Sequence, residues 1–316
     1  MHQSKVLLEV QNLKVNYRFR DKKIRAVDDV SFSVNEGDRF AIVGESGSGK
    51  STLGLSIIRL CPGEASGSVR LNNIDILKLS QEELRKLRGS DISVVFQDPN
   101  SALNPVLRVG DQLVEVFTTH GYSKAEAYSR SVELLETVGI PEPEKRIMSY
   151  PHQLSGGMKQ RVIIAMAIAL NPKLVIADEP TSALDVTIQA QILKLIKELS
   201  ETKKLSMILI THDIGVAAEV CNQIGIMYAG RMLEIGAFED IFHNPKHPYT
   251  QSLMTCVPKG LKCVLKPLPG SVPDMSDLPS GCKFHPRCPY ANEKCKTIEP
   301  ELEKVDGRYV ACHAVW

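Results

Sequence analysis

The stretch GESGSGKS, Gly44–Ser51, decides the fold class, because it matches the pattern G-x-x-x-x-G-K-[ST] of a phosphate-binding loop. The apolar run RFAIVG before it predicts a buried strand, and TLGLSIIRL after it has the apolar spacing of a helix. Glycines let such a loop wrap closely around phosphate, and backbone N–H groups at the helix N-terminus supply positive potential. We therefore expect Lys50 to reach the β- and γ-phosphates of a nucleotide and Ser51 to ligate Mg²⁺. The alternative is an ordinary glycine-rich turn in which the lysine occurs by chance. The strand before the motif and the helix after it argue against this alternative.

Strands and helices alternate on both sides of this phosphate loop. Residues 6–43 predict short strands, GSVRLNN a second small β segment, and about 98–170 a mainly helical region. Further along, KLVIAD and SMILITHD predict buried strands separated by the helical IQAQILKLIKELSE, and QIGIMYAGRMLEIG predicts a strand pair. The sequence thus predicts an α/β fold with a mostly parallel core sheet, an N-terminal antiparallel β subdomain and a helical subdomain. We expect one domain over 1–243, followed by a proline-rich C-terminal extension over 244–316 that buries little apolar area of its own.

Composition excludes some functions. The 316 residues carry a formal charge of only +1, which argues against a general electrostatic grip on nucleic acid or anionic lipid. The N-terminus has no uninterrupted apolar stretch of the kind a signal peptide needs. The most apolar stretch, RVIIAMAIALNPKLVIADEP, is interrupted by Asn171, Pro172 and Lys173, and the run before them is shorter than the ~20 residues that span a bilayer. We expect a reducing compartment and a membrane link only through a partner.

The strand motif LVIADEP places two acids at the end of a buried strand. Asp178 is expected to hold the Mg²⁺ shell, and Glu179 to orient and polarise the attacking water of a phosphoryl transfer. Taken alone, the two acids would be solvated residues at a strand end. Their combination with the phosphate loop favours a hydrolytic site.

A second anion-binding device lies in LSGGMKQR, Leu154–Arg161, where Ser155, Gly156 and Gly157 open a helix. Two phosphate-binding devices in one chain are explained by a head-to-tail pair of subunits, each completing the other's site. At this point the sequence resembles the ATP-binding-cassette (ABC) ATPases, whose signature is LSGGQ. Met158 stands where the family usually has glutamine.

The resemblance extends to four further motifs, in the family's order. It implies that Gln97 in VVFQDP senses γ-phosphate and Mg²⁺, that Ser182–Asp185 crosses a dimer interface, and that His212 in ILITHD contacts γ-phosphate. Tyr17, with Phe19 as the fallback, would stack on adenine. Each of these residues alone has an ordinary structural explanation. The implied nucleotide-contacting set is Tyr17, Gly44, Glu45, Ser46, Gly47, Ser48, Gly49, Lys50, Ser51, Thr52, Gln97, Asp178, Ser155, Gly156, Gly157 and Asp185. The implied catalytic residues are Glu179, His212, Gln97 and Lys50, and the implied Mg²⁺ site is Ser51, Gln97 and Asp178.

The C-terminal extension indicates the kind of cassette. NPKHPYTQSLM and LPGSVPDMSDLPSGCKFHPRCPYANEKC resemble the tail of ATPase subunits from bacterial and archaeal dipeptide, oligopeptide and nickel importers. The resemblance implies an ATPase at the cytoplasmic face of the membrane, working with a second ATPase subunit, two permeases and an external peptide-binding protein. We expect a permease contact around QDPNSALNPVLRVGDQLVEV. The alternatives are a nickel importer ATPase, a cassette ATPase acting on nucleic acid, and a regulatory cassette that binds ATP without turnover.

Four cysteines crowd the last part of the extension, residues 281–316, named here the cysteine-rich segment. Their spacing is C-x₅-C-x₆-C-x₁₆-C, through Cys282, Cys288, Cys295 and Cys312. Thiolates in a segment with little core of its own predict a metal staple, and the spacing leaves Zn²⁺ and an iron–sulfur cluster open. The resemblance to peptide-importer subunits implies a [4Fe–4S] cluster. His285 and His313 lie close by; either could replace a thiolate, but local packing or hydrogen bonding is their expected role. The other four cysteines fall outside this spacing: Cys61 and Cys221 are expected to act as small hydrophobes, and Cys256 and Cys263 remain unassigned.

Overall fold

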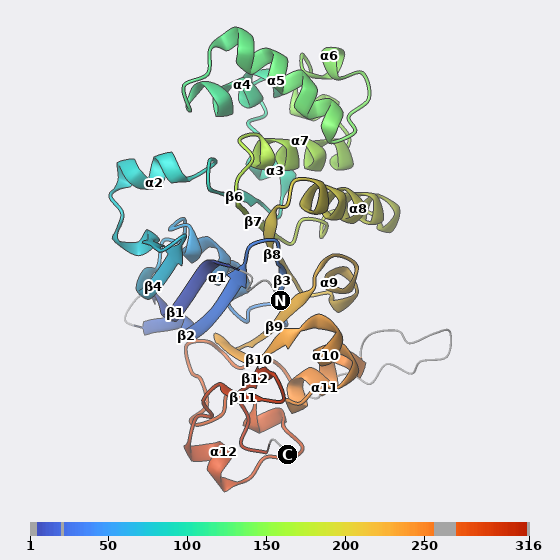
Figure 1. Ribbon diagram of the computed structural model, residues 1–316. Coiled ribbons are helices and arrows are strands. Elements are labelled where there is room, and N and C mark those ends of the chain that lie inside the picture. The colour runs from blue at the N-terminus through green and yellow to red at the C-terminus, as the bar shows by residue number, and fades with distance from the viewer. Residues whose placement is uncertain (1–4, 20–21, 256–269, 315–316) are drawn as a thin grey trace. The chain divides into compact units, whose positions relative to one another are not determined.

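The computed structural model describes residues 5–19, 22–255 and 270–314 (Figure 1). The chain forms two compact units, one made of Met1–Lys78 with Leu209–Trp316 and the other of Leu79–Ile208. The first unit is therefore discontinuous, since the whole second unit is inserted between its two parts. Cys256 and Cys263 lie outside the described residues.

The first unit contains the antiparallel sheet predicted at the N-terminus. Its strands follow the order β2-β1-β4-β5, and the pairs β1–β2, β1–β4 and β4–β5 are antiparallel. Alternating apolar residues explain this sheet, because they place one face of β1 and β2 in the core. The bounds are β1 (Val6–Phe19), β2 (Lys22–Asn35), β4 (Glu64–Leu71), β5 (Ile74–Asp75) and the short 3₁₀ turn η1 (Ile76–Lys78).

The other sheet of the first unit carries the phosphate loop. Within this unit the strand order is β11-β12-β10-β9-β3, with β3 and β9 parallel and β9 and β10 antiparallel. β3 ends at Val43, directly before the loop, and four of its five residues are buried. The elements are β3 (Arg39–Val43), α1 (Lys50–Ile57), β8 (Ser206–Thr211, which leads the chain from the second unit back into the first), α9 (Ile214–Val220), β9 (Gln223–Tyr228), β10 (Arg231–Ala237), α10 (Phe238–His243) and α11 (Pro248–Thr255).

The cysteine-rich segment is more ordered than the sequence predicts. It contains η3 (His285–Arg287), α12 (Glu293–Thr297), β11 (Glu303–Val305) and β12 (Arg308–Val310), and β12 pairs with β10 (Figure 1). The Ala311 N–H donates to the Leu233 carbonyl at 2.8 Å, and the buried Arg308 guanidinium lies 3.5 Å from the buried Glu234 carboxylate. The segment thus gains a core by packing on β10, a tertiary contact that composition does not reveal.

The second unit pairs a parallel two-strand ladder with helices. β6 and β7 run parallel, with Ile92 opposite Leu174 and Val95 opposite Ala177. Helices α3 to α7 fall between residues 99 and 168, which confirms the helical region predicted there. The elements are α2 (Gln81–Leu87), β6 (Ile92–Val95), α3 (Pro99–Ala102), α4 (Val109–Thr118), α5 (Lys124–Thr137), α6 (Pro143–Arg146), η2 (Pro151–Gln153), α7 (Gly156–Ile168), β7 (Leu174–Asp178) and α8 (Val186–Thr202).

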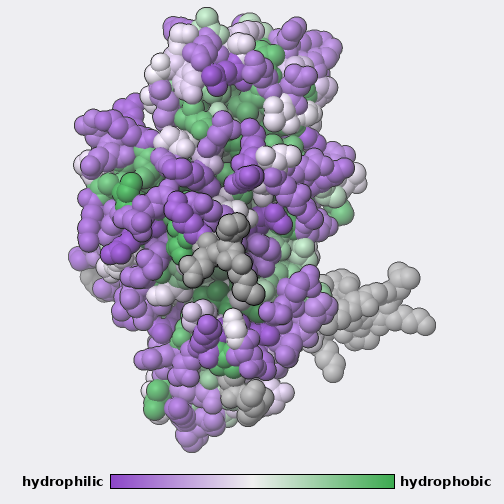
Figure 2. Space-filling view, viewed as in Figure 1, coloured by the Kyte–Doolittle hydropathy of each residue, from purple (hydrophilic) through white to green (hydrophobic). Residues whose placement is uncertain are grey.

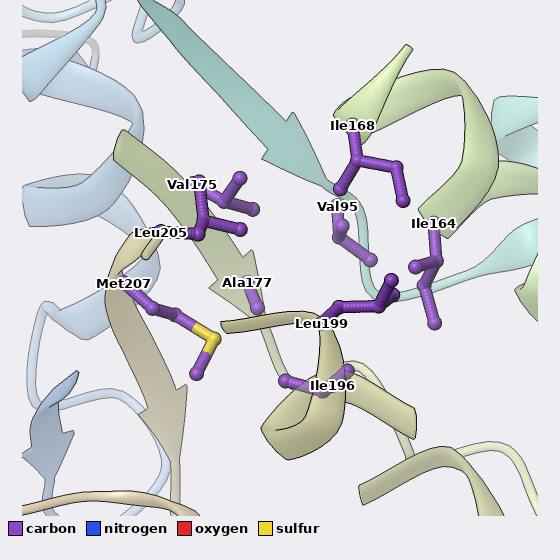
Figure 3. Close-up of a pocket in the computed structure, with 9 residues that line it drawn as sticks. All are labelled: Val95, Ile164, Ile168, Val175, Ala177, Ile196, Leu199, Leu205 and Met207. Atoms are coloured by element: carbon purple, nitrogen blue, oxygen red, sulfur yellow. The ribbon is translucent and has the colours of Figure 1, made fainter. Parts of the chain in front are cut away.

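A small apolar cavity marks the core of the second unit (Figure 3). Its lining comes from β6, β7, α7 and α8, together with Leu205 and Met207 next to and within β8, and all nine residues are apolar. Ile164 and Ile168 of α7 and Leu199 of α8 point toward it. With no polar group to orient a ligand, this space is a gap in the packing rather than a binding site.

In the part of the chain that the structure describes, no helix is both long enough and apolar enough to cross a bilayer. The face seen in Figure 2 is mostly hydrophilic, with hydrophobic residues in scattered groups.

Candidate functional site

The phosphate loop connects β3 to α1 with a backbone that only glycine accommodates at two positions. Gly47 has φ 78° and Gly49 φ 100°, both in the left-handed region. A Cβ on Gly49 would also collide with the Ala26 carbonyl oxygen, and one on Gly44 with the Met227 carbonyl oxygen. The close approach of β9 and β2 to the loop therefore requires glycine at Gly44 and Gly49, whereas at Gly47 only the backbone angle favours it.

Lys50 is folded into this loop. Its side chain is buried, and its ammonium donates to the carbonyl oxygens of Gly44 at 2.8 Å and Glu45 at 2.9 Å. The buried hydroxyl of Ser48 has no hydrogen-bond partner among the described residues. A charged donor, backbone N–H groups and an unsatisfied hydroxyl together form a site suited to an anion.

Tyr17 lies beside the first turn of α1. Its hydroxyl is 3.3 Å from the Thr52 hydroxyl and 2.8 Å from the Cys61 sulfur. Burial, followed by the hydrogen bond to Cys61, raises the pKa of Tyr17. The structure thus brings Tyr17 and Thr52 together, and it gives the half-buried Cys61 a polar partner where the sequence predicts a small hydrophobe. The Phe19 side chain lies outside the described part of the chain.

In the second unit, β7 ends at the two predicted acids. All five residues of β7 are buried, including Asp178, and the half-buried Glu179 follows with φ 42°. The Gln97 amide donates to the Glu179 carboxylate at 3.2 Å, so residues from two separate motifs meet at the carboxyl ends of β6 and β7. A non-glycine residue in the left-handed region is uncommon, and such positions concentrate at functional sites.

The second predicted anion site opens α7. Ser155 is the N-cap, and its hydroxyl accepts a hydrogen bond from the backbone N–H of Met158 at 3.3 Å. Because the Met158 backbone makes this contact, methionine in place of glutamine leaves the cap intact. Gly157 is required sterically, since a Cβ there would lie 2.7 Å from the Ile188 side chain.

Two predicted residues have intrachain surroundings that leave their roles open. The exposed Asp185 is the N-cap of α8 and accepts from the Ile188 N–H at 3.0 Å. His212 is exposed directly after β8, and the following Asp213 caps α9. A dimer contact by Asp185 and a phosphate contact by His212 therefore stay predictions.

The structure also shows a contact that the sequence did not indicate. The Arg287 guanidinium donates to both carboxylate oxygens of Glu45, at 2.7 and 3.0 Å. Glu45 belongs to the phosphate loop and Arg287 to the cysteine-rich segment, 242 residues later. No local pattern could have predicted the pair, because it depends on how the segment folds back.

The four clustered cysteines are free thiols close enough to influence one another. Cys282 and Cys295 are buried, Cys288 and Cys312 half-buried, and the Cys282 N–H donates to the Cys295 carbonyl at 2.8 Å. Burial, with a contribution from the other three thiols, raises the pKa of Cys282 to about 11. Among the described residues, however, no three His, Cys, Asp or Glu side chains are arranged to hold a metal ion.

The histidines near these thiols bond locally, as predicted. His285 Nδ1 lies 2.9 Å from the Cys282 carbonyl, and His313 Nε2 lies 2.9 Å from the Ile298 carbonyl. The buried Cys221, where desolvation raises the thiol pKa to about 12, behaves as the small hydrophobe that the sequence predicts.

Comparison with known proteins identifies the family. Residues 27–182 match the family model described as ABC transporter, and residues 233–295 the model described as oligopeptide/dipeptide transporter, C-terminal region. The dipeptide transport ATP-binding protein DppD of Haemophilus influenzae is 50% identical, over 97% of this chain and 95% of that protein. The chain belongs to the ABC transporter ATP-binding proteins. The oligopeptide transport ATP-binding protein OppD of Salmonella typhimurium is 47% identical to this ABC protein, and the alignment covers 97% of this chain and 93% of OppD.

Solved ABC cassettes confirm the fold of this ATP-binding protein. The ATP-binding cassette MJ0796, in a dimeric post-hydrolysis state bound to ADP and Pi, superposes with a TM-score of 0.66 at 32% identity, over 73% of this chain and 99% of that one. The protein cbiO1 of Clostridium perfringens gives a TM-score of 0.65 at 30% identity, over 76% of this chain and 92% of that one. This ABC protein is therefore an ATPase with the phosphate-loop fold that the sequence predicts.

Proposed function

We propose that this chain is the ATP-hydrolysing subunit of an importer of dipeptides or oligopeptides. The observation that carries the proposal is the match of residues 233–295 to the oligopeptide/dipeptide transporter C-terminal region. Relatives that are 47–50% identical over almost the whole chain are named as dipeptide and oligopeptide transport ATP-binding proteins. Both findings fit the sequence-based prediction and disfavour an ATPase acting on nucleic acid.

The residues of the site take the following roles in this proposal. The phosphate loop and Lys50 bind the phosphates, Ser51 and Asp178 hold Mg²⁺ with Gln97, and Tyr17 stacks on adenine. Glu179 polarises the attacking water and His212 contacts the γ-phosphate. The hydrogen bond between Gln97 and Glu179 supports a shared role, since it lets the γ-phosphate sensor orient the base.

A second ATPase subunit completes the site head-to-tail. Ser155, Gly156 and Gly157 of each subunit then face the nucleotide of the other, and Asp185 lies at the interface. The dimeric MJ0796 cassette supports the pairing of two cassettes. ATP binding closes the pair, and hydrolysis reopens it. From the cytoplasmic face of the membrane, this cycle drives two separate permease subunits. An external peptide-binding protein delivers the peptide to these permeases.

The decisive experiment measures what stimulates the ATPase. The chain is co-purified with the proteins of its transporter, and the complex is placed in nanodiscs together with its binding protein. Dipeptides or oligopeptides should raise ATP turnover several-fold, while Ni²⁺ and duplex DNA should leave it unchanged. Stimulation by Ni²⁺ alone would reassign the complex as a nickel importer, and stimulation by DNA would exclude a transporter role.

We further propose that the thiols of Cys282, Cys288, Cys295 and Cys312 hold a [4Fe–4S] cluster, with Zn²⁺ as the alternative. The proposal is supported by four free thiols in one short segment, none of them fully exposed. Thiolate is the ligand that both metals accept, and the cluster would hold the segment folded.

Metal content tests this directly. Anaerobically purified protein should contain about four iron atoms per chain and show the broad visible absorbance of an iron–sulfur cluster. Cys295→Ser should lose the iron, whereas Cys61→Ser, outside the set, should keep it. One zinc atom per chain without visible absorbance would establish the alternative, and metal-free protein would exclude both.

A further inference from the structure

The cysteine-rich segment contacts the phosphate loop through a bidentate ion pair. Arg287 is the last residue of η3, and its Nη1 and Nη2 donate to the two carboxylate oxygens of Glu45 at 2.7 and 3.0 Å. The Arg287 side chain is 6% exposed and that of Glu45 26%. Such bidentate pairs are among the stronger charge-assisted contacts, and they fix direction as well as distance.

Buried aromatic rings hold the guanidinium in this direction. Its central carbon lies 5.7 Å from the Tyr228 ring centre and 6.0 Å from that of Phe284, and Nη1 is 3.4 Å from the Tyr228 hydroxyl. Tyr228 and Phe284 are fully buried and meet edge to face at 5.4 Å. Arg287 therefore reaches Glu45 from a rigid support rather than as a flexible surface side chain.

Glu45 is held at three points, and one of them is the phosphate-loop lysine. Its N–H donates to the Tyr249 hydroxyl at 3.1 Å, and its carbonyl accepts from the Lys50 ammonium at 2.9 Å. Any shift of Glu45 moves an acceptor that fixes Lys50. Arg287 thus acts on the lysine through Glu45.

The pair also has an electrostatic consequence. A carboxylate in the second position of a phosphate-binding loop repels the polyphosphate that the loop binds, unless a cation compensates for it. Arg287 supplies that cation from outside the loop. Its removal would leave Glu45 charged, partly buried and free to move toward the phosphates.

We propose that Arg287 is a positioning residue for the phosphate loop, so that the affinity for ATP depends on the folded state of the cysteine-rich segment. The inference rests on the ATP binding proposed above and adds a regulatory link to it. Whatever unfolds the segment, including loss of the thiols' ligand, then weakens nucleotide binding because Glu45 loses the Arg287 contact.

The test is the affinity of the full-length chain for the fluorescent analogue trinitrophenyl-ATP. Arg287→Gln should weaken binding of the analogue about tenfold, and Arg287→Lys about threefold. The lysine ammonium keeps the positive charge but cannot make the paired hydrogen bonds of the guanidinium. In the double variant Glu45→Gln/Arg287→Gln, the uncompensated carboxylate is gone, and affinity should return to within about threefold of wild type. Rescue by a second substitution is a result that a purely structural role of Arg287 would not give.

Lys283→Gln provides the matched control. Lys283 lies in the same segment and is 13% exposed, and its ammonium pairs with Glu299 at 3.5 Å and donates to the Pro279 carbonyl at 3.0 Å. Both of these partners belong to the C-terminal extension rather than to the phosphate loop, so the affinity of this variant for the analogue should match wild type. If Arg287→Gln fails to fold, the Lys and double variants, which leave no uncompensated carboxylate, decide the question.

The outcomes separate this inference from the proposed function. Unchanged affinity in Arg287→Gln overturns the inference alone, as does an equal loss in the single and double variants. A wild-type chain that binds no nucleotide would overturn the proposed function and the inference with it.

Discussion

The phosphate loop and the cysteine-rich segment lie in the same unit, yet the chain builds them in different ways. The loop is a short contiguous stretch whose shape follows from glycine backbone angles, such as φ 100° at Gly49. The cysteine-rich segment takes its order from distant partners, with β12 pairing on β10 and Phe284 packing on Tyr228 and Tyr249. Substitutions in the loop should therefore change nucleotide binding, and those in the segment, apart from Arg287, should mainly change stability.

The largest expected effect separates nucleotide binding from turnover. Glu179→Gln removes the proposed base and should lower ATP turnover of the assembled complex about 1,000-fold, equivalent to about 4 kcal/mol. Binding of trinitrophenyl-ATP should stay within about threefold of wild type, because the phosphate loop is intact. Glu198→Gln, an exposed glutamate on α8, is the control and should not change turnover. Equal turnover in wild type and Glu179→Gln would favour a regulatory cassette.

The next effect tests whether the stability of the cysteine-rich segment depends on its packing against distant residues of the same unit. Phe284→Ala removes a ring that is fully buried 5.4 Å from Tyr228 and 5.3 Å from Tyr249, and should lower the free energy of unfolding by about 3 kcal/mol. Urea unfolding followed by circular dichroism measures this. Ile298→Ala, at a position 52% exposed in the same segment, should cost less than about 0.5 kcal/mol. Similar losses in both variants would mean that the segment has no specific core.

The loop side of the comparison is tested by Gly49→Ala. The added Cβ would meet the Ala26 carbonyl, and the backbone angle is itself unfavourable for alanine. We expect nucleotide affinity to fall about 100-fold, or about 2.7 kcal/mol. Gly37→Ala is the matched control, since Gly37 has φ 81° and a Cβ added there would have no atom within 4 Å. It should share the backbone strain and leave affinity unchanged; equal affinity loss in both would refute a local effect at Gly49.

The smallest effect distinguishes a simple helix cap from a phosphate contact. Ser155 and Ser123 cap α7 and α5 with the same geometry, each accepting an N–H at 3.3 Å. Replacing either by alanine should cost about 1 kcal/mol of stability. Only Ser155→Ala should also lower turnover of the assembled complex, by about tenfold. Matching turnover in the two variants would assign Ser155 a capping role alone.

The sequence predicts the phosphate loop much better than it predicts the cysteine-rich segment. The phosphate loop, the two acids at the end of β7 and the capped start of α7 were predictable, because short-range geometry demands those residue types in that order. The pairing of β12 with β10 and the contact of Arg287 with Glu45 were not, because they join residues far apart in the chain. The irregular extension predicted from the sequence accordingly contains, over residues 285–310, a helix and strands that tertiary contacts stabilise.

The pairing of β12 with β10 also affects how prone the protein is to aggregate through an exposed strand edge. Without it, the apolar and largely buried β10 would present unpaired N–H and C=O groups to other chains. β12 covers that edge, and β11 then ends the sheet with three residues, of which Glu303 and Lys304 are charged and exposed. A short, charged last strand is a poor template for another chain. The C-terminal hairpin thus serves as a guard against aggregation, whatever the thiols beside it bind.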